Sequence, residues 1–402
     1  MSSDFSTTVE QALAAKRIAG GAAIAIDDTG RTIIHKQFGK ISTEDNARPF
    51  TFDTTFWIAS SSKLLTSISA LQCVEKGLLK LDDDIGDILP EWKDPDILTG
   101  FDESNKPIHI KAKNRITLRR LLTHSSGMTY GEMYPLLVQY RKTVLNKEPD
   151  ADIGMLTRHK NPLICEPGSS WNYGPSIDWA GHLVEVVTGL TLGSYMTKHI
   201  FDPLGMTSTT FEPLSNPDIM AHMTGRVGRD AITGLVGPET SGLCQVRNPQ
   251  DHLGGEGLYS CANDYITVLT SLLLDDGKLL AKSGEMYKSL FSPQLENPSA
   301  FHSWATNPIM SAYFAPGLPR DPTTTEWDYG LGGALVMKEP SGQAGRGTLF
   351  WSGYANNYWF VDQENGVAGY YGNWILPAGD AVTGQMFRAL QTAAVKEVAG
   401  SK

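Results

Sequence analysis

The pattern of hydrophobic and polar positions along this chain predicts strands near both ends of the sequence and helices between them. Residues 21–27 form a short apolar run typical of a buried strand, and a turn at residues 28–30 leads into a partner strand at residues 32–38. Near the other end, the same pattern predicts strands at residues 331–337, 347–351, 357–362 and 367–374. Since a hairpin turn at Glu364-Asn365-Gly366 joins the last two, we expect a central antiparallel sheet.

Helical periodicity is clearest outside these strands. Residues 5–17 and 380–398 predict helices that cover the sheet. From about residue 81 to 203 the strand signal fades, and the clearest helices are expected at residues 117–123 and 176–188. The pattern favours an α/β (α+β) fold in which both chain ends build one lobe and the middle forms an inserted helical lobe. The expected lobes are residues 1–80 with 204–402, and residues 81–203.

One predicted helix carries a candidate nucleophile at its start. After Lys63, apolar residues recur at helical spacing and Gly77 follows as a stop signal, which predicts a helix packed along one side. Ser60 lies three residues before Lys63, so the hydroxyl and the amine share one helix face near the positive end of the helix dipole. Ser60 is therefore either a nucleophile with Lys63 as its base, or a helix cap followed by a solvated lysine.

Composition excludes several classes of function. The 34 Lys and Arg against 44 Asp and Glu give a net charge of −10, which disfavours nucleic acid and anionic membranes as partners. No apolar run reaches transmembrane length and the N-terminus does not resemble a signal peptide, so we expect a cytoplasmic protein. Cys73, Cys165, Cys244 and Cys261 are widely spaced, and no His pattern suits a metal. We expect free thiols and no metal or other cofactor.

A second candidate site residue is Tyr173, in a loop between Gly168 and Gly174 that permits close backbone approach. Its phenol is able to exchange a proton with a lysine during catalysis. The alternative is a tyrosine that packs on Trp171 in a turn. The distance along the chain between Tyr173 and Ser60 does not decide between these interpretations.

A third segment, residues 350–357, follows at the end of a predicted strand. Gly353 at a strand edge lets a substrate acyl group lie beside the backbone. The backbone N–H groups of Ser60 and Tyr354 are then the expected oxyanion hole, in which loss of one donor typically costs about 3–4 kcal/mol. The alternative is an ordinary bulge or turn.

Taken in this order, these segments resemble the serine β-lactamase and penicillin-binding-protein superfamily. Within it, the chain is similar to the family VIII esterases and to the fungal statin acyltransferases (transesterases). The likeness covers most of the chain and rests on residues 59–66, 70–73, 116–127, 173–174, 178–181 and 254–257. Together these segments are highly specific, whereas Ser-x-x-Lys alone is common.

The resemblance implies a β-lactamase-like fold and an acyl-enzyme mechanism with Ser60 as nucleophile, Lys63 as its base partner and Tyr173 as the third catalytic residue. It also implies that Trp351-Ser352-Gly353 takes the place of the Lys-Thr-Gly strand of β-lactamases. Because Trp351 cannot bind the carboxylate of a penicillin as that lysine does, β-lactam hydrolysis is disfavoured as the main activity.

Two further positions depart from these relatives. The motif Tyr173-Gly174-Pro175 replaces Tyr-x-Asn, so an Asn contact to substrate is lost. Trp57 stands where the statin acyltransferase has Arg, so we expect an apolar or aromatic substrate and no acidic polyketide acceptor. The expected substrate-binding residues are Trp57, Tyr130, Trp351 and Gly353, and further candidates for the pocket wall are Trp304, Tyr313 and Trp327.

Two motifs receive a structural interpretation. His124 is a candidate for a Ser-His-Asp set, but the family resemblance implies a structural role, with His124 hydrogen-bonded at a helix end. The run Gly254-Gly255-Glu256-Gly257 is not followed by a phosphate-loop pattern, so we expect it to let chain segments pack closely near the cleft.

We therefore expect a serine acyltransferase that moves an acyl group from an ester or thioester, free or carrier-bound, to an alcohol of a secondary-metabolite-type substrate. The first alternative is a carboxylesterase or lactonase of the same fold and mechanism, with water as the acceptor. The second is a non-catalytic binding or scaffold protein, which has no need of Ser60, Lys63 and Tyr173. The oligomeric state stays open.

Overall fold

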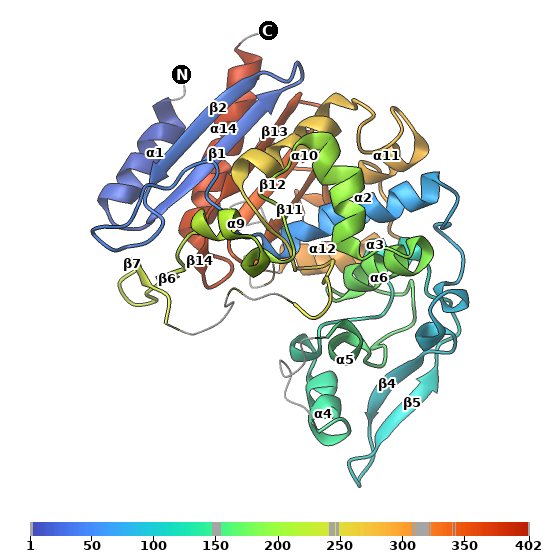
Figure 1. The fold of residues 1–402 in the computed structure, drawn as a ribbon. Helices are drawn as coiled ribbons and strands as arrows, with labels where there is room; N and C mark the ends of the chain where they lie inside the picture. Colours follow the sequence, from blue (N-terminus) through green and yellow to red (C-terminus); the bar gives the residue numbers. More distant parts are fainter. Residues whose placement is uncertain are drawn as a thin grey trace.

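The computed structural model describes residues 3–146, 154–240, 246, 249–307, 310, 321, 323–339, 341 and 343–400. In this part of the chain, seven antiparallel strands form one sheet in the order β2-β1-β13-β12-β11-β10-β9 (Figure 1). Its strands are β1 (Gly20–Asp27), β2 (Thr32–Gly39), β9 (Glu326–Tyr329), β10 (Ala334–Lys338), β11 (Thr348–Gly353), β12 (Asn357–Asp362) and β13 (Val367–Gly372). β1 pairs with β13, so the two chain ends close into a single sheet. The expected central antiparallel sheet is confirmed.

Helices and short strands surround this sheet. The helices are α1 (Ser3–Ala14), α2 (Ser62–Glu75), α3 (Leu118–Leu122), α4 (Pro135–Thr143), α5 (Met155–His159), α6 (Ser176–Thr188), α7 (Leu192–Met196), α8 (Asp202–Leu204), α9 (Pro217–Ala221), α10 (Ala262–Leu274), α11 (Glu285–Leu290), α12 (Pro298–Thr306) and α14 (Ala381–Ala399). The short strands are β3 (Phe56–Trp57), β4 (Asp96–Phe101), β5 (Pro107–Lys111), β6 (Val227–Arg229), β7 (Val236–Pro238), β8 (Tyr259–Ser260) and β14 (Ile375–Leu376).

The two faces of the sheet are covered by different helices. Tyr358 of β12 stacks on Phe387 of α14, and Tyr371 stands opposite Tyr358 in the register of β12 and β13. Because successive side chains of a strand alternate between faces, Tyr370 points to the other face, where it stacks on Tyr265 of α10. α1 packs beside α14, so the helices from the two chain ends lie together (Figure 1).

Helix α2 lies inside the molecule, and its environment corrects one expectation. The sequence predicts a helix packed along one side, but the residues from Ser62 to Cys73 are all buried. Its polar residues are satisfied by other parts of the chain: Thr66 donates to the Gly254 carbonyl at 2.7 Å, and Gln72 donates to the Leu279 carbonyl at 2.7 Å. A polar stripe on this helix therefore marks buried hydrogen bonds and not solvent.

The middle of the chain contains strands that the sequence pattern did not predict. β4 and β5 form an antiparallel hairpin that projects at the lower edge of Figure 1, beside α4 and α5. The hairpin is short and most of β5 is exposed, so it lacks the alternation of a half-buried strand. The division into two lobes at residues 81 and 203 stays a prediction.

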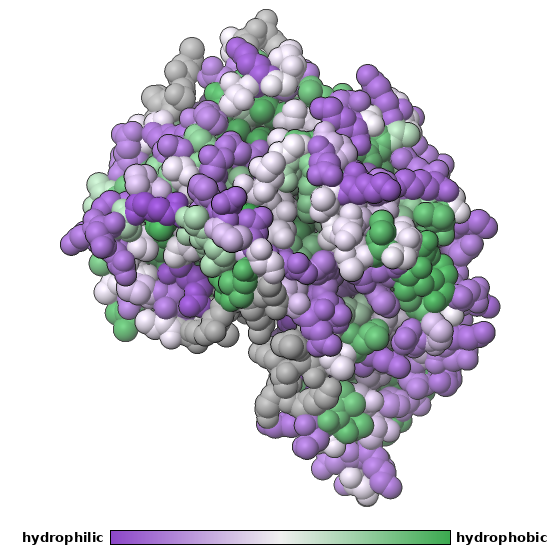
Figure 2. Space-filling view, in the orientation of Figure 1, coloured by the Kyte–Doolittle hydropathy of each residue, from purple (hydrophilic) through white to green (hydrophobic). Residues whose placement is uncertain are grey.

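The surface and the cysteines agree with the composition. The face shown in Figure 2 is mostly hydrophilic, with hydrophobic side chains in small groups. Among the described residues, no helix has the length and apolar character needed to cross a membrane. Cys73 and Cys261 are buried free thiols and Cys165 is a half-buried one, whereas Cys244 lies outside the described residues.

Candidate active site

Ser60 occupies a tight turn at the start of the buried helix α2. The 3₁₀ turn Ala59–Ser61 runs directly into α2, and Ala59 adopts a positive φ of 48°, which is uncommon for a residue other than glycine. The backbone of the residue before Ser60 is thus held in a strained conformation, as is frequent at functional sites. Ser60 itself is half-buried and reachable from one side.

Lys63 lies beneath Ser60 and is almost fully enclosed, at 3% exposure. Its Nζ is 3.1 Å from Ser60 Oγ, 3.3 Å from the Tyr130 hydroxyl and 2.7 Å from the Gly255 carbonyl oxygen. The interpretation as a solvated lysine after a capping serine is therefore wrong, because Lys63 is buried and the Ser60 hydroxyl points to it.

Tyr173 completes the contacts of the serine hydroxyl. Its phenol oxygen donates to Ser60 Oγ at 2.7 Å, while its ring stacks near Trp171 with centroids 6.1 Å apart. Tyr173 therefore contacts Ser60 and also packs near Trp171, and its catalytic role stays a prediction. Tyr173 is half-buried, whereas Lys63 is enclosed.

The Tyr173 loop is held in place by the segment that follows α3. The amide of Asn172 donates to the His124 carbonyl at 2.9 Å, and Thr129 Oγ1 donates to the Tyr173 carbonyl at 2.9 Å. A Cβ on Gly174 would lie 2.5 Å from Thr129 Cα, so this approach requires a glycine.

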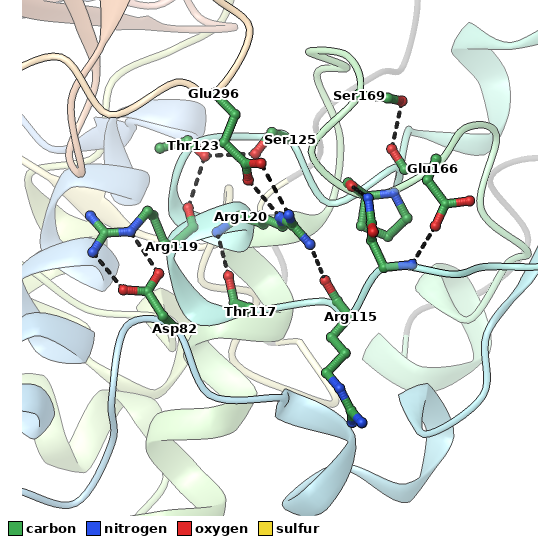
Figure 3. Close-up of polar contacts among 12 residues, drawn as sticks. Asp82, Arg115, Thr117, Arg119, Arg120, Thr123, Ser125, Glu166, Ser169 and Glu296 are labelled. Carbon is green, nitrogen blue, oxygen red and sulfur yellow. Dashed lines mark hydrogen bonds and ion pairs between the residues drawn. The ribbon is translucent and has the colours of Figure 1, made fainter.

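Charged pairs hold α3 itself, as Figure 3 shows. Arg120 makes a two-point contact with Glu296 at 2.7 and 3.1 Å, and Arg119 makes one with Asp82 at 2.7 and 2.8 Å. Two-point contacts between Arg and a carboxylate fix geometry as well as charge. Glu296 precedes α12, so the pair ties the Tyr130 and Tyr173 segments to the part of the chain that carries Trp304.

The end of β11 meets the Ser60 turn at very close range. A Cβ on Gly353 would lie 2.1 Å from the Ile58 carbonyl oxygen. Asn357 joins the same two segments, because its side chain accepts from Ser61 Oγ at 2.5 Å and donates to the Ile58 carbonyl at 3.3 Å. The Tyr354 amide therefore belongs to a turn clamped against Ser60, as an oxyanion hole requires; its pairing with the Ser60 amide stays a prediction.

An aromatic wall stands beside Tyr173. The rings of Trp351 and Trp304 lie 5.5 and 6.2 Å from the Tyr173 ring. Trp57 lies near Tyr354, with the two ring centroids 6.2 Å apart. The indole N–H of Trp57 donates to the Glu256 carbonyl at 2.5 Å. Of the other wall candidates, Trp327 is buried against Phe350, and Tyr313 lies outside the described residues.

Burial shifts the titration of the groups around Lys63. It raises the pKa of Tyr130 well above its usual range, so this phenol stays neutral. It lowers the pKa of His124 well below its usual range, and the nearby Lys63 adds to that effect. Burial also raises the pKa of the Asp178 carboxyl to about 6, a shift that Glu256 increases and Lys63 opposes.

The backbone of His124 is hydrogen-bonded at the end of α3, as expected, with its amide donating to the Leu121 carbonyl at 3.2 Å, but its side chain is not. Within the described part of the chain, neither ring nitrogen of His124 has a hydrogen-bond partner. The ring packs instead among aromatic side chains, 4.9 Å from Tyr173, 5.7 Å from Trp171 and 5.7 Å from Tyr329. A neutral imidazole held among rings orients Tyr173 and is no base for Ser60.

The sequence interpretation missed two contacts of this site. The glycine run at residues 254–257 was assigned to packing alone, yet its Gly255 carbonyl is the shortest contact of Lys63. Asn357 stands in a noted segment but had no assigned role. Local sequence predicts neither contact. The Gly255 carbonyl accepts from Lys63, and the Asn357 side chain donates to the Ile58 carbonyl, and each pair lies far apart in the sequence.

A further cavity lies away from Ser60. A cavity of about 680 Å³ is lined by residues of α7 and by segments near Phe211 and His252, and does not include Ser60. Among the described residues, no group of three or more His, Cys, Asp or Glu side chains is placed to hold a metal ion.

The sheet with helices on both faces and the Ser60–Lys63–Tyr173 cluster define the class of serine enzymes with a β-lactamase-like fold. Comparison with known proteins makes this specific: the Beta-lactamase family profile matches residues 5–371, so the chain belongs to the Beta-lactamase family.

Similar proteins cover nearly the whole chain. A lovastatin esterase of Penicillium rubens is 35% identical over 90% of this chain and 90% of its own length. A monacolin J acid methylbutanoyltransferase of Aspergillus terreus is 31% identical over 96% of this chain and 94% of its own. A mutant of simvastatin synthase from Aspergillus terreus superposes with a TM-score of 0.88 at 30% identity, covering 98% of this chain and 95% of that one. The expected likeness to fungal statin acyltransferases and esterases is confirmed.

Proposed function

We propose that this protein is a serine acyltransferase that works through an acyl-enzyme on Ser60. One observation carries the proposal: Ser60 Oγ is held by both Lys63 Nζ, at 3.1 Å, and the Tyr173 hydroxyl, at 2.7 Å. A serine hydroxyl with two proton-transfer groups in contact is the arrangement that nucleophilic catalysis needs. The similarity to named acyltransferases supports the same reaction class.

The proposed reaction has two halves. Ser60 Oγ attacks the carbonyl carbon of an ester or thioester as its proton passes to Lys63, and the backbone amides of Ser60 and Tyr354 hold the oxyanion. The tetrahedral intermediate then expels the alcohol or thiol, which takes a proton through Tyr173. In the second half an acceptor alcohol loses its proton through Tyr173 and attacks the acyl group, and Ser60 recovers its proton.

The aromatic wall supports an apolar or aromatic substrate. Trp351 and Trp304 stand beside Tyr173, and Trp57 keeps its indole N–H on the Glu256 carbonyl. Glu256 is itself paired with Arg158, at 2.6 Å. We infer a small-molecule donor, either a free ester or a thioester on a carrier, and an acceptor of the secondary-metabolite type.

Hydrolysis is the second candidate, because one similar protein is a named esterase. Both reactions share the acyl-enzyme and differ only in what resolves it, an alcohol or water. The similarity to named acyltransferases over nearly the whole chain favours transfer. Trp351 in place of a lysine argues against β-lactam hydrolysis as the main activity.

The test is an assay with an aryl butyrate ester and a rising concentration of a simple alcohol. We expect the new ester to exceed free butyrate as alcohol increases, and Ser60→Ala to abolish both products. Ser69→Ala is the matched control, because Ser69 is a buried serine of the same helix whose hydroxyl donates only to the Leu65 carbonyl. Full turnover by Ser60→Ala would overturn the proposal, whereas free butyrate at every alcohol concentration would assign hydrolysis.

A further inference from the structure

A buried carboxylate that the reaction above does not use lies beside the site. Asp178 is near the start of α6 and is 2% exposed. Its Oδ1 accepts a hydrogen bond from the Gly255 amide at 2.9 Å. In the described part of the chain, its Oδ2 has no hydrogen-bond partner. Burying a carboxylate with one oxygen unpaired costs folding free energy. A carboxylate at this position therefore indicates a role other than stability.

Gly255 connects this carboxylate to Lys63. Its amide donates to Asp178, and its carbonyl accepts from Lys63 Nζ at 2.7 Å. A Cβ on Gly255 would lie 2.5 Å from Asp178 Oδ2, so the carboxylate rests directly on the glycine backbone. One residue therefore separates the negative group from the amine.

The surrounding charges leave these two groups to balance each other. Arg158 of α5 and Glu256 form their own ion pair at 2.6 Å. Tyr130 stays neutral because burial raises its pKa well above the usual range, and His159 stays neutral because burial lowers its pKa well below it. The other charged groups on α6 and the helices packed against it have partners elsewhere: Arg119 with Asp82, Arg120 with Glu296, His182 with Glu185, Lys76 with Tyr195, and Glu75 with the Ala281 amide. Burial raises the pKa of the Cys73 thiol, so this group stays neutral.

We propose that Asp178 is a positioning residue that stabilises the ammonium form of Lys63, through charge and through Gly255, when Lys63 takes the proton of Ser60. The inference rests on the proposed function of Ser60. A buried amine that gains a proton needs a nearby negative charge, and Asp178 supplies it without touching the substrate.

The charge of Asp178 makes this contribution depend on pH. Burial raises the pKa of Asp178 to about 6. Its carboxylate is therefore formed above about pH 6 and is lost below it, so Ser60 should react more slowly as the pH falls through this range. For stability the sign is opposite: a raised folded pKa means that folding favours the protonated form, and that contribution is lost as pH rises.

The experiment measures the rate at which a fluorophosphonate labels Ser60 between about pH 5 and 8. Peptide mass spectrometry identifies the labelled residue. Asp178→Asn keeps the size and the acceptor for the Gly255 amide but removes the charge. At the upper pH, we expect Asp178→Asn to be labelled about 10- to 100-fold more slowly than wild type, which is a part of the rate gain that a positioned base contributes. We also expect its labelling rate not to fall as the pH drops through about 6, whereas the wild-type rate does. Melting at the upper pH should be no lower than wild type.

The control is Asp264→Asn. Asp264 is another buried helical aspartate, which accepts from the Ser208 amide at 2.7 Å and from Thr209. This variant should keep the wild-type acid limb. Absence of wild-type labelling at Ser60 would refute the proposed function and this inference together. Labelling in wild type without an acid limb, an unchanged Asp178→Asn profile, or a lower melting temperature or failed folding of Asp178→Asn would overturn this inference alone.

Discussion

At the scale of single residues, the three residues proposed for catalysis differ in their exposure to solvent. Lys63 is 3% exposed, whereas Ser60 and Tyr173 are half-buried. Lys63, the proposed base partner, is thus shielded from water, whereas Ser60 and Tyr173 are partly accessible. The sequence assigns Tyr130 to substrate binding, and the structure adds a contact between its hydroxyl and Lys63 Nζ at 3.3 Å.

Tyr130→Phe tests that contact. The Tyr130 phenol is neutral, so its removal takes one hydrogen bond from Lys63 and no charge. We expect kcat/KM for an aryl ester to fall about 5- to 10-fold, the equivalent of about 1 kcal/mol for one hydrogen bond, with little change in KM. Steady-state kinetics give both values.

Tyr287→Phe is the matched control, because the Tyr287 hydroxyl likewise accepts from a side-chain N–H, that of Gln363 at 2.6 Å, but away from Ser60. It should keep wild-type kcat/KM. A rise in KM with unchanged kcat for Tyr130→Phe would instead support the original assignment to substrate binding.

How far single residues were predictable depends on how local their contacts are. Ser60 and Lys63 are three positions apart on one helical turn, so spacing alone suggests the pair. Tyr173 required the family resemblance, because 113 positions separate it from Ser60. The Asn357 side chain donates to the Ile58 carbonyl. A pattern of residue types does not predict a contact with a backbone group that is distant in the sequence.

At the scale of elements, β11 and the turn before α2 form one unit. Gly353 lets the strand end approach Ile58, and Asn357 ties the following strand to the same turn. The strand therefore sets the position of the Tyr354 amide relative to Ser60.

Gly353→Ala is expected to separate the strand end from the Ser60 turn. A Cβ would meet the Ile58 carbonyl at 2.1 Å, so the backbone must shift. We expect a loss of stability of about 1–3 kcal/mol, typical of overpacking, and a fall in kcat of about 100-fold or more, typical of a lost oxyanion donor. Urea unfolding and steady-state assays measure the two effects.

Gly237→Ala controls for this prediction, since Gly237 also lies in a strand, β7, and a Cβ there would meet nothing within 4 Å. It should leave kcat unchanged. Wild-type kcat in Gly353→Ala would show that the strand end does not build the oxyanion hole.

The sequence predicts helices and strands correctly where buried residues recur at the spacing of a helix or a strand, and it fails where they do not. The helix at residues 176–188 and the strand at residues 357–362 have the predicted bounds. β9 and the β4–β5 hairpin were missed, because they are short and their exposure does not alternate cleanly. α2 was predicted as a helix but assigned the wrong environment, since its polar residues bond to buried carbonyls.

At the scale of the whole molecule, the site exists only when distant segments assemble. Both chain ends supply the sheet, whose β1 pairs with β13, and the site draws on residues near positions 60, 130, 173, 255 and 353. The antiparallel sheet was predictable from hairpin signals at each end. The closure between those ends was not, because strand order depends on tertiary packing that periodicity does not encode.

The acyl-enzyme is the claim on which the rest depends. The most direct measurement mixes the protein with an aryl butyrate ester, quenches with acid within the first turnovers, and maps the modified peptide by mass. We predict one butyryl group, carried on Ser60, and none in Ser60→Ala. Turnover of the ester with the butyryl group on another residue, or with no covalent adduct at any quench time, would contradict the account.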